Sequence, residues 1–310
     1  MALPLVLRRL LSPHGSTVRA NGVKVHWVEA GEGPGTPLVL LHGLGDSHLT
    51  WSKVLPSLAR KRRVLVPDLC GHGLSGRPDV DYSLDFHART MARWLEELRI
   101  PQADIVGHSY GGGVAQWMLL YPYHRVRKVG LVSAGGLGRE VSMALRVAAT
   151  PHLVERLGQP FMATGTFLAL STAIRGVYST RELVKLSLAN GRLGTARAFA
   201  RTVRDVIDLG GQRRGFHQHA HQIAEIPPIG IFWGDSDPII PMEHGLDAAR
   251  TIPGASIACF ARCGHYPHRE RPGTFADALE AFLDRDDAVS TPSPWAAPPP
   301  DALTAAAAAS

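Results

Sequence analysis

The feature that most constrains this chain is a serine between two glycines, placed where an apolar strand meets a helix. Residues 105–113 read Ile-Val-Gly-His-Ser-Tyr-Gly-Gly-Gly, with Ser109 at the bend, and the apolar residues 114–120 favour a helix. Gly-x-Ser-x-Gly in this setting is typical of a nucleophile elbow, a turn so tight that it leaves the serine hydroxyl exposed. The motif alone also suits a plain strand-to-helix turn in a chain with 32 glycines. Other segments must therefore supply a base, an acid and an anion site.

The order of predicted strands and helices indicates an α/β fold with a mostly parallel sheet. Residues 17–29 alternate in hydropathy around Asn21-Gly22, which predicts an antiparallel hairpin. Apolar runs typical of strands buried on both faces lie at 37–41, 63–67, 105–106, 126–133, 229–233 and 256–260. Helices are expected between them, at 54–61, from Ser83 to about Arg99, after the elbow, at 243–251 and from Arg271. This alternation is the pattern of βαβ units.

Residues 135–225 interrupt the alternation with several amphipathic helices separated by glycines, and no convincing buried strand. An insertion of this size predicts a helical cap. We therefore divide the chain into an N-terminal extension (1–16), a core (17–134 and 226–285), the cap (135–225) and a Pro/Ala-rich tail (286–310) that is expected to be disordered. The cap aromatics are expected to form mainly the core of the cap and otherwise to line a passage for substrate; they are Phe161, Phe167, Tyr178 and Phe199.

Composition excludes several classes of function. The net charge of +6 comes from 28 Arg and 5 Lys that are scattered rather than grouped, so no nucleic-acid partner is expected. No apolar run is long enough to span a bilayer and no cleavage site follows the first twelve residues, so neither a signal peptide nor stable membrane insertion is expected. Cys70, Cys259 and Cys263 form no C-x-x-C pair. The chain is therefore expected in the reducing cytoplasm, without a disulfide framework.

Three polar residues follow predicted strands in the order Ser109, Asp237, His265. Parallel sheets build their sites at the carboxyl ends of the strands, so these side chains are expected to meet. A serine hydroxyl is a weak nucleophile and needs a base together with a group that orients the base. The order serine, acid, histidine is that of the α/β-hydrolase fold, and differs from the orders in the chymotrypsin and subtilisin folds.

Over residues 17–284 the chain resembles proteins of the α/β-hydrolase superfamily. The segments that carry the resemblance are His42-Gly43-Leu44-Gly45, residues 68–75 and 107–112, Trp233-Gly234-Asp235-Ser236-Asp237 with Pro241, and Gly264-His265-Tyr266-Pro267-His268. The resemblance implies a mostly parallel eight-stranded sheet with helices on both faces and the cap inserted after the sixth strand. It also implies that Ser109 is the nucleophile, His265 the general base and then general acid, and Asp237 the orienting acid.

Asp235 competes with Asp237 for the role of acid. In the family pattern W-G-x-x-D-x-x-x-P the second aspartate and Pro241 are in register, so we assign Asp237 and interpret Asp235 as a turn residue that bonds its own backbone. An oxyanion hole needs two backbone N–H groups aimed at the developing charge. By the resemblance these belong to Leu44 and Tyr110.

Other histidines receive no catalytic role. His42 and His108 are interpreted as packing and loop-shaping groups, because one base suffices for the mechanism. His217, His219 and His221 would share one face of a strand and suggest a metal, but they would diverge on a helix, which their neighbours favour. We therefore expect neither a metal nor a cofactor.

Several activities remain compatible with these residues. Dehalogenases and epoxide hydrolases of the superfamily carry aspartate at the elbow, so Ser109 disfavours both. Hydrolysis of an ester-type bond (carboxylic ester, thioester or lactone) through an acyl-enzyme is the first expectation. Residues 132–138 are similar to some meta-cleavage-product hydrolases, which cleave C–C bonds, although those enzymes commonly have Trp after the catalytic histidine and this chain has Tyr266.

Two further classes stay open: a ligand-binding protein that has lost turnover, and a cofactor-independent oxygenase or perhydrolase. A binding protein has no need of a complete serine, acid and histidine set, which favours an enzyme. The expected partner is a small, largely apolar acyl substrate. The chain is expected to act either alone or as a homodimer.

Overall fold

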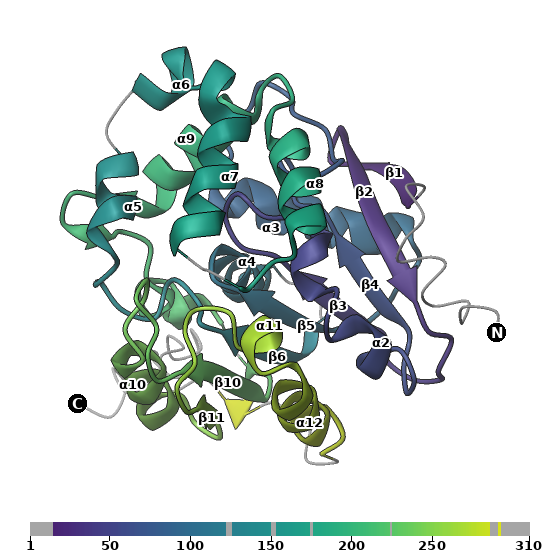
Figure 1. The fold of residues 1–310 in the computed structure, drawn as a ribbon. Coiled ribbons are helices and arrows are strands. Elements are labelled where there is room, and N and C mark those ends of the chain that lie inside the picture. Colours follow the sequence, from purple (N-terminus) through teal and green to yellow (C-terminus); the bar gives the residue numbers. More distant parts are fainter. Residues whose placement is uncertain are drawn as a thin grey trace, which may run out of the picture.

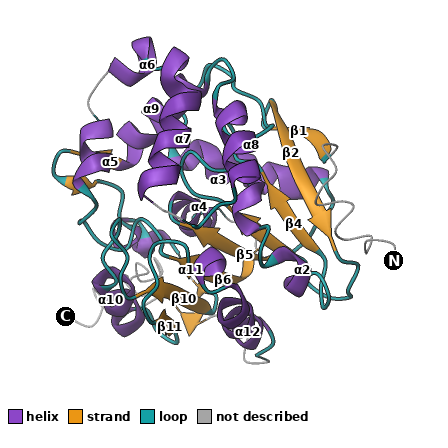
Figure 2. Ribbon diagram, viewed as in Figure 1, coloured by secondary structure: helices purple, strands orange, loops and turns teal. Residues whose placement is uncertain are grey.

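An eight-stranded sheet forms the centre of the molecule, in the order β1-β2-β4-β3-β5-β6-β10-β11 (Figures 1 and 2). The computed structural model describes residues 15–121, 126–149, 153–173, 176–223, 225–285 and 291–292. The strands are β1 Ser16–Ala20, β2 Val23–Ala30, β3 Leu38–Leu41, β4 Val64–Pro67, β5 Ala103–His108, β6 Val126–Val132, β10 Ile229–Gly234 and β11 Ser256–Phe260. The strands from β4 to β11 in this order run parallel, and β2 is antiparallel to both of its neighbours, β1 and β4. The predicted mostly parallel sheet is confirmed.

The antiparallel edge begins with the predicted hairpin. Asn21 and Gly22 have φ values of 50° and 76°, which is the left-handed geometry of a tight two-residue turn. Asn and Gly tolerate these angles better than other residues. The turn sets the register, in which Ala20 is opposite Val23 and Val18 is opposite Val25.

Helices cover both faces of the sheet, as the resemblance implies. On one face lie α3 (Leu84–Glu97), α4 (Tyr110–Met118) and α10 (Glu243–Thr251), and on the other α2 (Leu55–Leu58) and α12 (Pro272–Leu283). Successive side chains of a strand point to opposite faces. In β3, Val39 and Leu41 therefore pack in the first core, whereas Leu38 and Leu40 pack in the second. This explains why the buried strands read as continuous apolar runs.

The helix boundaries follow local signals to different extents. Ser83 caps α3 by accepting a hydrogen bond from the Phe86 backbone N–H at 3.1 Å, as predicted. The helix expected at 54–61 is shortened to α2 and is preceded by the 3-10 turn η1 (His48–Trp51), which was not predicted. A short helix α11 (Pro267–Glu270) between β11 and α12 was also not predicted.

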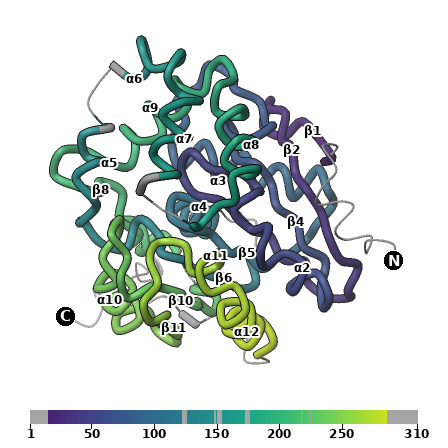
Figure 3. The backbone as a smooth tube through the Cα atoms, in the orientation of Figure 1, coloured from purple at the N-terminus to yellow at the C-terminus, as the bar shows by residue number. Residues whose placement is uncertain are grey.

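The cap is inserted between β6, the sixth strand, and β10, and its helices lie over one edge of the sheet (Figures 1 and 3). It contains α5 (Met143–Ala148), α6 (Leu153–Leu157), η2 (Gln159–Phe161), α7 (Met162–Ala173), α8 (Thr180–Asn190), α9 (Thr195–Val206), η3 (Phe216–Gln218) and η4 (Ala220–Gln222). Ile207–Asp208 (β7) and Gly211–Gln212 (β8) form a small hairpin, so the expectation of a strand-free cap is wrong there. Two-residue strands are too short for a recognisable alternation.

The chain ends fall largely outside the described residues, including residues 1–14 of the predicted extension and most of the tail. Within the predicted tail, Thr291–Pro292 (β12) pairs with Glu225–Ile226 (β9), so these two residues do not form the separate segment that was expected. In the part of the chain that the structure describes, every helix is too short or too polar to cross a bilayer.

Candidate active site

Ser109 lies between β5 and α4, with φ 52° and ψ −117°. Such a strained conformation persists only where the surrounding structure holds it, and it is common at functional sites. The glycines on either side, Gly107 and Gly111, are required because the turn leaves no room for a Cβ at either position. A Cβ at Gly107 would lie 2.2 Å from the carbonyl oxygen of Gly111, and one at Gly111 would lie 2.6 Å from the carbonyl oxygen of His42. The structure therefore has the tight turn that the motif predicts.

Asp237 follows β10 and His265 follows β11, and the parallel pairing of these strands brings the two loops together. His265 Nδ1 donates to Asp237 Oδ2 at 2.7 Å, and both side chains are buried. Asp237 Oδ1 accepts from the backbone N–H groups of Ile239 and Ile240. Burial alone raises the pKa of Asp237, but the charge of His265 and these hydrogen bonds lower it below its usual value. The ionised carboxylate can thus orient the imidazole.

The competing acid, Asp235, is exposed and lies away from this pair. Its Oδ1 accepts hydrogen bonds from the Ser236 hydroxyl at 2.8 Å and from the Cys263 backbone N–H at 3.4 Å. Of the two aspartates, Asp237 is the one that the structure places on His265.

His108 joins the elbow to the loop that carries His265. Its Nε2 donates to the backbone carbonyl of His265 at 2.8 Å, and the two imidazole centroids are 4.8 Å apart. Burial, followed by the proximity of His265, holds the pKa of His108 well below its usual value, so His108 is neutral. This contact puts Ser109, the next residue, beside the histidine loop. The contacts of His108 agree with its predicted role in packing and in shaping the loop.

The turn after β3 carries the predicted oxyanion donor Leu44 and contacts the elbow. A Cβ at Gly43 would lie 3.2 Å from the Ser109 Cβ, so the two turns are in close approach. His42 Nδ1 donates to the Gly43 carbonyl at 2.8 Å and steadies the turn. Leu44 and Tyr110 line the same cavity as Ser109.

This cavity encloses about 510 Å³, including its opening to solvent. Its apolar lining comes from both the core and the cap, namely Leu44, Leu84, Val141, Leu145, Val206, Ile207 and Ile240. Two polar cap side chains, Gln212 and Arg214, also line it. Gln212 Oε1 accepts from the Gly136 backbone N–H at 2.8 Å and Arg214 pairs with Asp205 at 2.6 Å. The remaining surface favours an apolar ligand.

The cap aromatics do not line the cavity. Tyr178 is buried against the core, Phe199 is partly buried, Phe161 is 69% exposed and Phe167 is 37% exposed. The expectation that these aromatics form mainly the core of the cap is therefore wrong for Phe161 and Phe167, which are both exposed. The cap side of the cavity wall is aliphatic because α5, the last residue of α9 and β7 contribute Leu145, Val206 and Ile207, whereas Phe199 of α9 does not line it.

Two side chains at the ends of α8 hold the turn that carries Leu44, and neither was predicted to matter. The Tyr178 hydroxyl donates to Asp46, and Asn190 Nδ2 donates to the Gly45 carbonyl at 2.6 Å. Both bonds join residues more than 130 positions apart, so no local pattern reveals them. The capping box at Ser179, which starts α8, is the local signal that could have located this helix end.

Arg269, four residues after His265, ties the same cap helix to the core. Its guanidinium is fully buried and donates to the Val177 carbonyl at 2.9 Å, to Glu182 at 2.9 Å and to two carbonyl groups of η1 at 2.7 and 3.1 Å. It also lies 3.9 Å from the ring centroid of Tyr178. A buried cation with this many acceptors fixes the start of α8 to the histidine loop.

Removal of the Asn190 amide should lower kcat rather than raise KM, because Asn190 positions the turn that carries Leu44, the predicted oxyanion donor, and does not line the cavity. We expect Asn190→Ala to reduce kcat by about tenfold, the effect of about 1–2 kcal/mol for a lost buried hydrogen bond. Ser187→Ala is the matched control, because Ser187 is buried on the same helix and its hydroxyl has no partner among the described residues. Steady-state kinetics on a soluble ester tests this, and a change confined to KM would contradict it.

The two buried cysteines near the site are not reactive. Burial raises the pKa of both Cys70 and Cys263 to about 12, so both stay thiols. Residues 217, 219 and 221 lie on or between the 3-10 turns η3 and η4 and not on a strand. His219 packs edge-on against Trp117 at 5.0 Å. The strand on which the three histidines would share one face is thus not formed.

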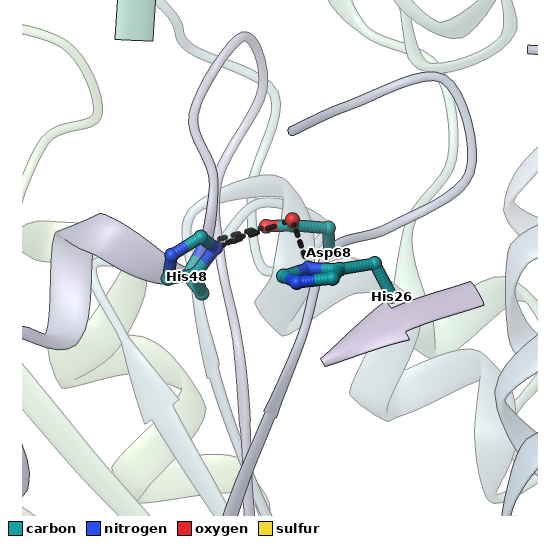
Figure 4. Close-up of side chains that lie close together, drawn as sticks. All are labelled: His26, His48 and Asp68. Atoms are coloured by element: carbon teal, nitrogen blue, oxygen red, sulfur yellow. Dashed lines mark hydrogen bonds and ion pairs between the residues drawn. The ribbon is translucent and has the colours of Figure 1, made fainter. Parts of the chain in front are cut away.

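One cluster in the described chain has the residue types of a metal site: His26, His48 and Asp68 offer ligand atoms within 4.8 Å of one another (Figure 4). Asp68 Oδ2 accepts from His26 Nδ1 at 2.8 Å and from the Leu74 backbone N–H at 2.9 Å. Asp68 Oδ1 accepts from the backbone N–H and Nδ1 of His48, at 2.7 and 3.0 Å. Hydrogen bonds thus occupy both oxygens. We interpret the cluster as a structural tie between β2, β4 and η1.

Asp68→Asn should lower the free energy of unfolding by about 3 kcal/mol, because it leaves buried donors without their charged partner. Asp79→Asn is the control. Asp79 pairs with Arg197 and Arg201 at the surface, where such pairs contribute about 0–1 kcal/mol. Urea unfolding measures both. A chelator should leave the wild-type midpoint unchanged, and a large shift on chelation would favour a metal instead.

The same cluster predicts a pH window for stability. Burial raises the pKa of Asp68, but His48 and the hydrogen bonds lower it well below its usual value, so this contribution is present above about pH 4 and is lost on acidification. Burial lowers the pKa of His48, but the charge of Asp68 outweighs burial and raises it. The contribution of His48 is thus complete below about pH 6.5 and is lost as the pH rises through its raised pKa.

Comparison with known proteins agrees with this geometry. A family model described as alpha/beta hydrolase fold matches residues 36–272. An uncharacterized protein of Mycobacterium tuberculosis is 34% identical over 273 residues, which cover 82% of this chain and 76% of that protein. The 2-hydroxymuconate semialdehyde hydrolase of Pseudomonas sp. (strain CF600) is 29% identical over 286 residues, covering 89% of this chain and 96% of that enzyme.

A solved structure shows the same likeness. The meta-cleavage product hydrolase from Pseudomonas fluorescens IP01 has a TM-score of 0.70 and 25% sequence identity, over 87% of this chain and 97% of that chain. The family model covers more than half of the chain, and the sheet order and the strained serine turn agree with it. The chain therefore belongs to the α/β hydrolase fold family.

Proposed function

We propose that this hydrolase cleaves an ester-type bond of a small, largely apolar substrate through an acyl-enzyme, with Ser109, His265 and Asp237 as catalytic residues. The hydrogen bond between Asp237 and His265, beside a serine strained at the wall of an aliphatic cavity, carries the proposal. Asp237 holds the Nδ1–H tautomer of His265, which leaves Nε2 free to act as a base.

In the proposed reaction, Ser109 Oγ attacks the carbonyl carbon while its proton passes to His265 Nε2. The backbone N–H groups of Leu44 and Tyr110 bind the oxyanion of the tetrahedral intermediate. His265 then protonates the departing alcohol, thiol or ring oxygen, and the acyl group stays on Ser109. A water molecule, deprotonated by the same nitrogen, attacks the acyl carbon and releases the acid and the free serine.

A C–C bond hydrolase of the meta-cleavage type is the second candidate. The printed names of two of the similar proteins favour it. Tyr266, which stands where those enzymes commonly carry Trp, packs its ring 4.7 Å from His108 and 6.0 Å from Tyr178. The side chain of Tyr266 therefore joins the cap to the core. Because this chain lacks the Trp that those enzymes commonly carry, we place ester-type hydrolysis first.

A substrate panel separates the candidates. p-Nitrophenyl esters of rising acyl length should be turned over by the wild type, whereas a vinylogous 1,5-diketone should be turned over slowly. A fluorophosphonate should label the wild type on the peptide that contains Ser109. Faster turnover of the diketone would favour C–C hydrolysis, and labelling without any turnover would favour a binding protein. Oxygen consumption with either substrate would favour an oxygenase.

We further propose a reducing compartment, the cytoplasm, as the place where the chain acts. Cys70, Cys259 and Cys263 are all free. Oxidising compartments favour disulfides. Fractionation of the native cells with an antibody to the chain tests this, and recovery among secreted proteins would contradict it.

A further inference from the structure

α7 and α8 pack against each other (Figure 1). None of their exposed residues in the described chain is acidic, because Glu182 of α8 is partly buried and pairs with Arg269. Apart from its first residue, Thr180, the exposed residues of α8 are Arg181, Val184, Lys185 and Leu188. Their spacing of three, four and seven places them on one stripe, opposite the buried Leu183 and Leu186. Within the described residues neither Arg181 nor Lys185 has an acidic partner.

α7 and the turn before it add apolar surface beside this stripe. α7 contains no charged residue, and Phe161, Phe167 and Leu168 are 69%, 37% and 55% exposed. We call the outward surface of the two helices, together with Phe161 directly before α7, the cap face; it consists of Phe161, Phe167, Leu168, Arg181, Val184, Lys185 and Leu188.

Exposed apolar side chains are concentrated on the cap. Of the eleven large apolar side chains that are exposed in the described part of the chain, ten lie between residues 135 and 225, and the other is Leu74. Scattered single residues of this kind need no explanation, whereas a group of neighbours marks a binding surface, and five of the ten belong to the cap face.

The net positive charge of the chain is also concentrated in the cap. Residues 135–225 contain twelve Lys and Arg against six Asp and Glu, a net charge of +6, and the rest of the chain contains 21 of each sign. The whole net charge of the protein therefore belongs to the cap. A second copy docked through the same face would bring two such caps together, which electrostatic repulsion opposes.

We propose that the cap face docks on an anionic lipid surface. Phenylalanine and leucine side chains between lysine and arginine are the composition of helices that lie in the interface plane. α7 and α8, at 12 and 11 residues, suit that position and are too short to span a bilayer. Cations close to an anionic membrane are attracted by its negative surface potential. The inference concerns surface binding and is independent of which bond the site cleaves.

Vesicle flotation of the full chain tests the proposal. The wild type should bind vesicles of equal parts phosphatidylcholine and phosphatidylglycerol, at least about tenfold more tightly than pure phosphatidylcholine, with affinity that falls as salt rises. Arg181→Glu with Lys185→Glu should reduce the binding by more than about tenfold. Leu168→Asp with Leu188→Asp should reduce it similarly, because the insertion of both apolar side chains is lost.

The matched control reverses two exposed cations elsewhere, with Arg19→Glu and Lys24→Glu on the β1–β2 hairpin. This variant has the same net charge as the first and should bind like the wild type. Equal losses in the two variants, or no preference for phosphatidylglycerol, would overturn the proposal. A dimer in solution that Leu188→Asp dissociates would also overturn it, since the face would then belong to a second copy. Unchanged thermal midpoints confirm that every variant is folded.

Discussion

Ser109→Ala is expected to reduce kcat by about 10⁵- to 10⁶-fold on any ester that the wild type hydrolyses, because Ser109 is the group that we propose to form the acyl-enzyme. Alanine fits the site, since it removes one oxygen and leaves the φ of 52° as strained as before. The thermal midpoint should therefore stay close to that of the wild type. Stopped assays with long incubation measure the residual rate, and a fluorophosphonate should no longer label the protein.

The matched control for this change is Ser133→Ala. Ser133 is also buried, also has a positive φ, of 43°, and follows the neighbouring strand β6. Its hydroxyl has no hydrogen-bond partner among the described residues. The control should keep the rate within about threefold, as expected where no transition-state contact is lost. Equal rates for Ser109→Ala and the wild type would exclude Ser109 as the nucleophile.

Asp237→Asn should lower kcat by about 10⁴-fold while it leaves KM nearly unchanged, because the amide no longer holds the Nδ1–H tautomer of His265. The side chain keeps its size, and its Oδ1 can still accept from the Ile239 backbone N–H. The loss should therefore appear in chemistry rather than in folding. Steady-state kinetics and thermal unfolding distinguish the two.

Asp235→Asn provides the control for that experiment, because Asp235 lies two residues earlier, is exposed and contacts Ser236 instead of the histidine. Its rate should stay within about threefold of the wild type. If Asp235→Asn were the inactive variant and Asp237→Asn the active one, the assignment of the acid would be reversed. Loss of activity in both variants would indicate that the substitutions act by changing the shape of the loop and not through the acid itself.

The parts of the fold that were predictable have short-range causes. The Asn21-Gly22 turn, the Ser83 cap and the apolar runs of the parallel strands each act within a few residues. The choice of Asp237 over Asp235 rested on the family pattern and the register of Pro241, and the structure places the same residue on His265. Chain order and strand position were enough to bring these loops to one edge of the sheet.

The contacts between cap and core were not predictable, because they join distant positions through single side chains. The bonds from Tyr178 to Asp46 and from Asn190 to Gly45 have no periodicity that a sequence could display. The helices of the cap were expected to be amphipathic, but α7 has no charged face and is largely exposed. An uncharged helix is usually buried, so its sequence suggested the opposite of what the structure shows.

The buried guanidinium of Arg269 restricts how the cavity can open. Lifting the start of α8 from the core would strip this cation of its acceptors, at a cost of several kcal/mol. The start of α8 is thus fixed to the core by a buried cation. α5, which contacts α9 and carries the cavity-lining Leu145, is joined to the core by the hydrogen bond from the Ser142 backbone N–H to the Ile239 carbonyl, and within the described residues it forms no salt bridge. Amide hydrogen exchange should accordingly be faster across α5 than at Tyr178. A substrate would then pass the nucleophile from that side, and the size of acyl group accepted would depend on how far one six-residue helix can swing.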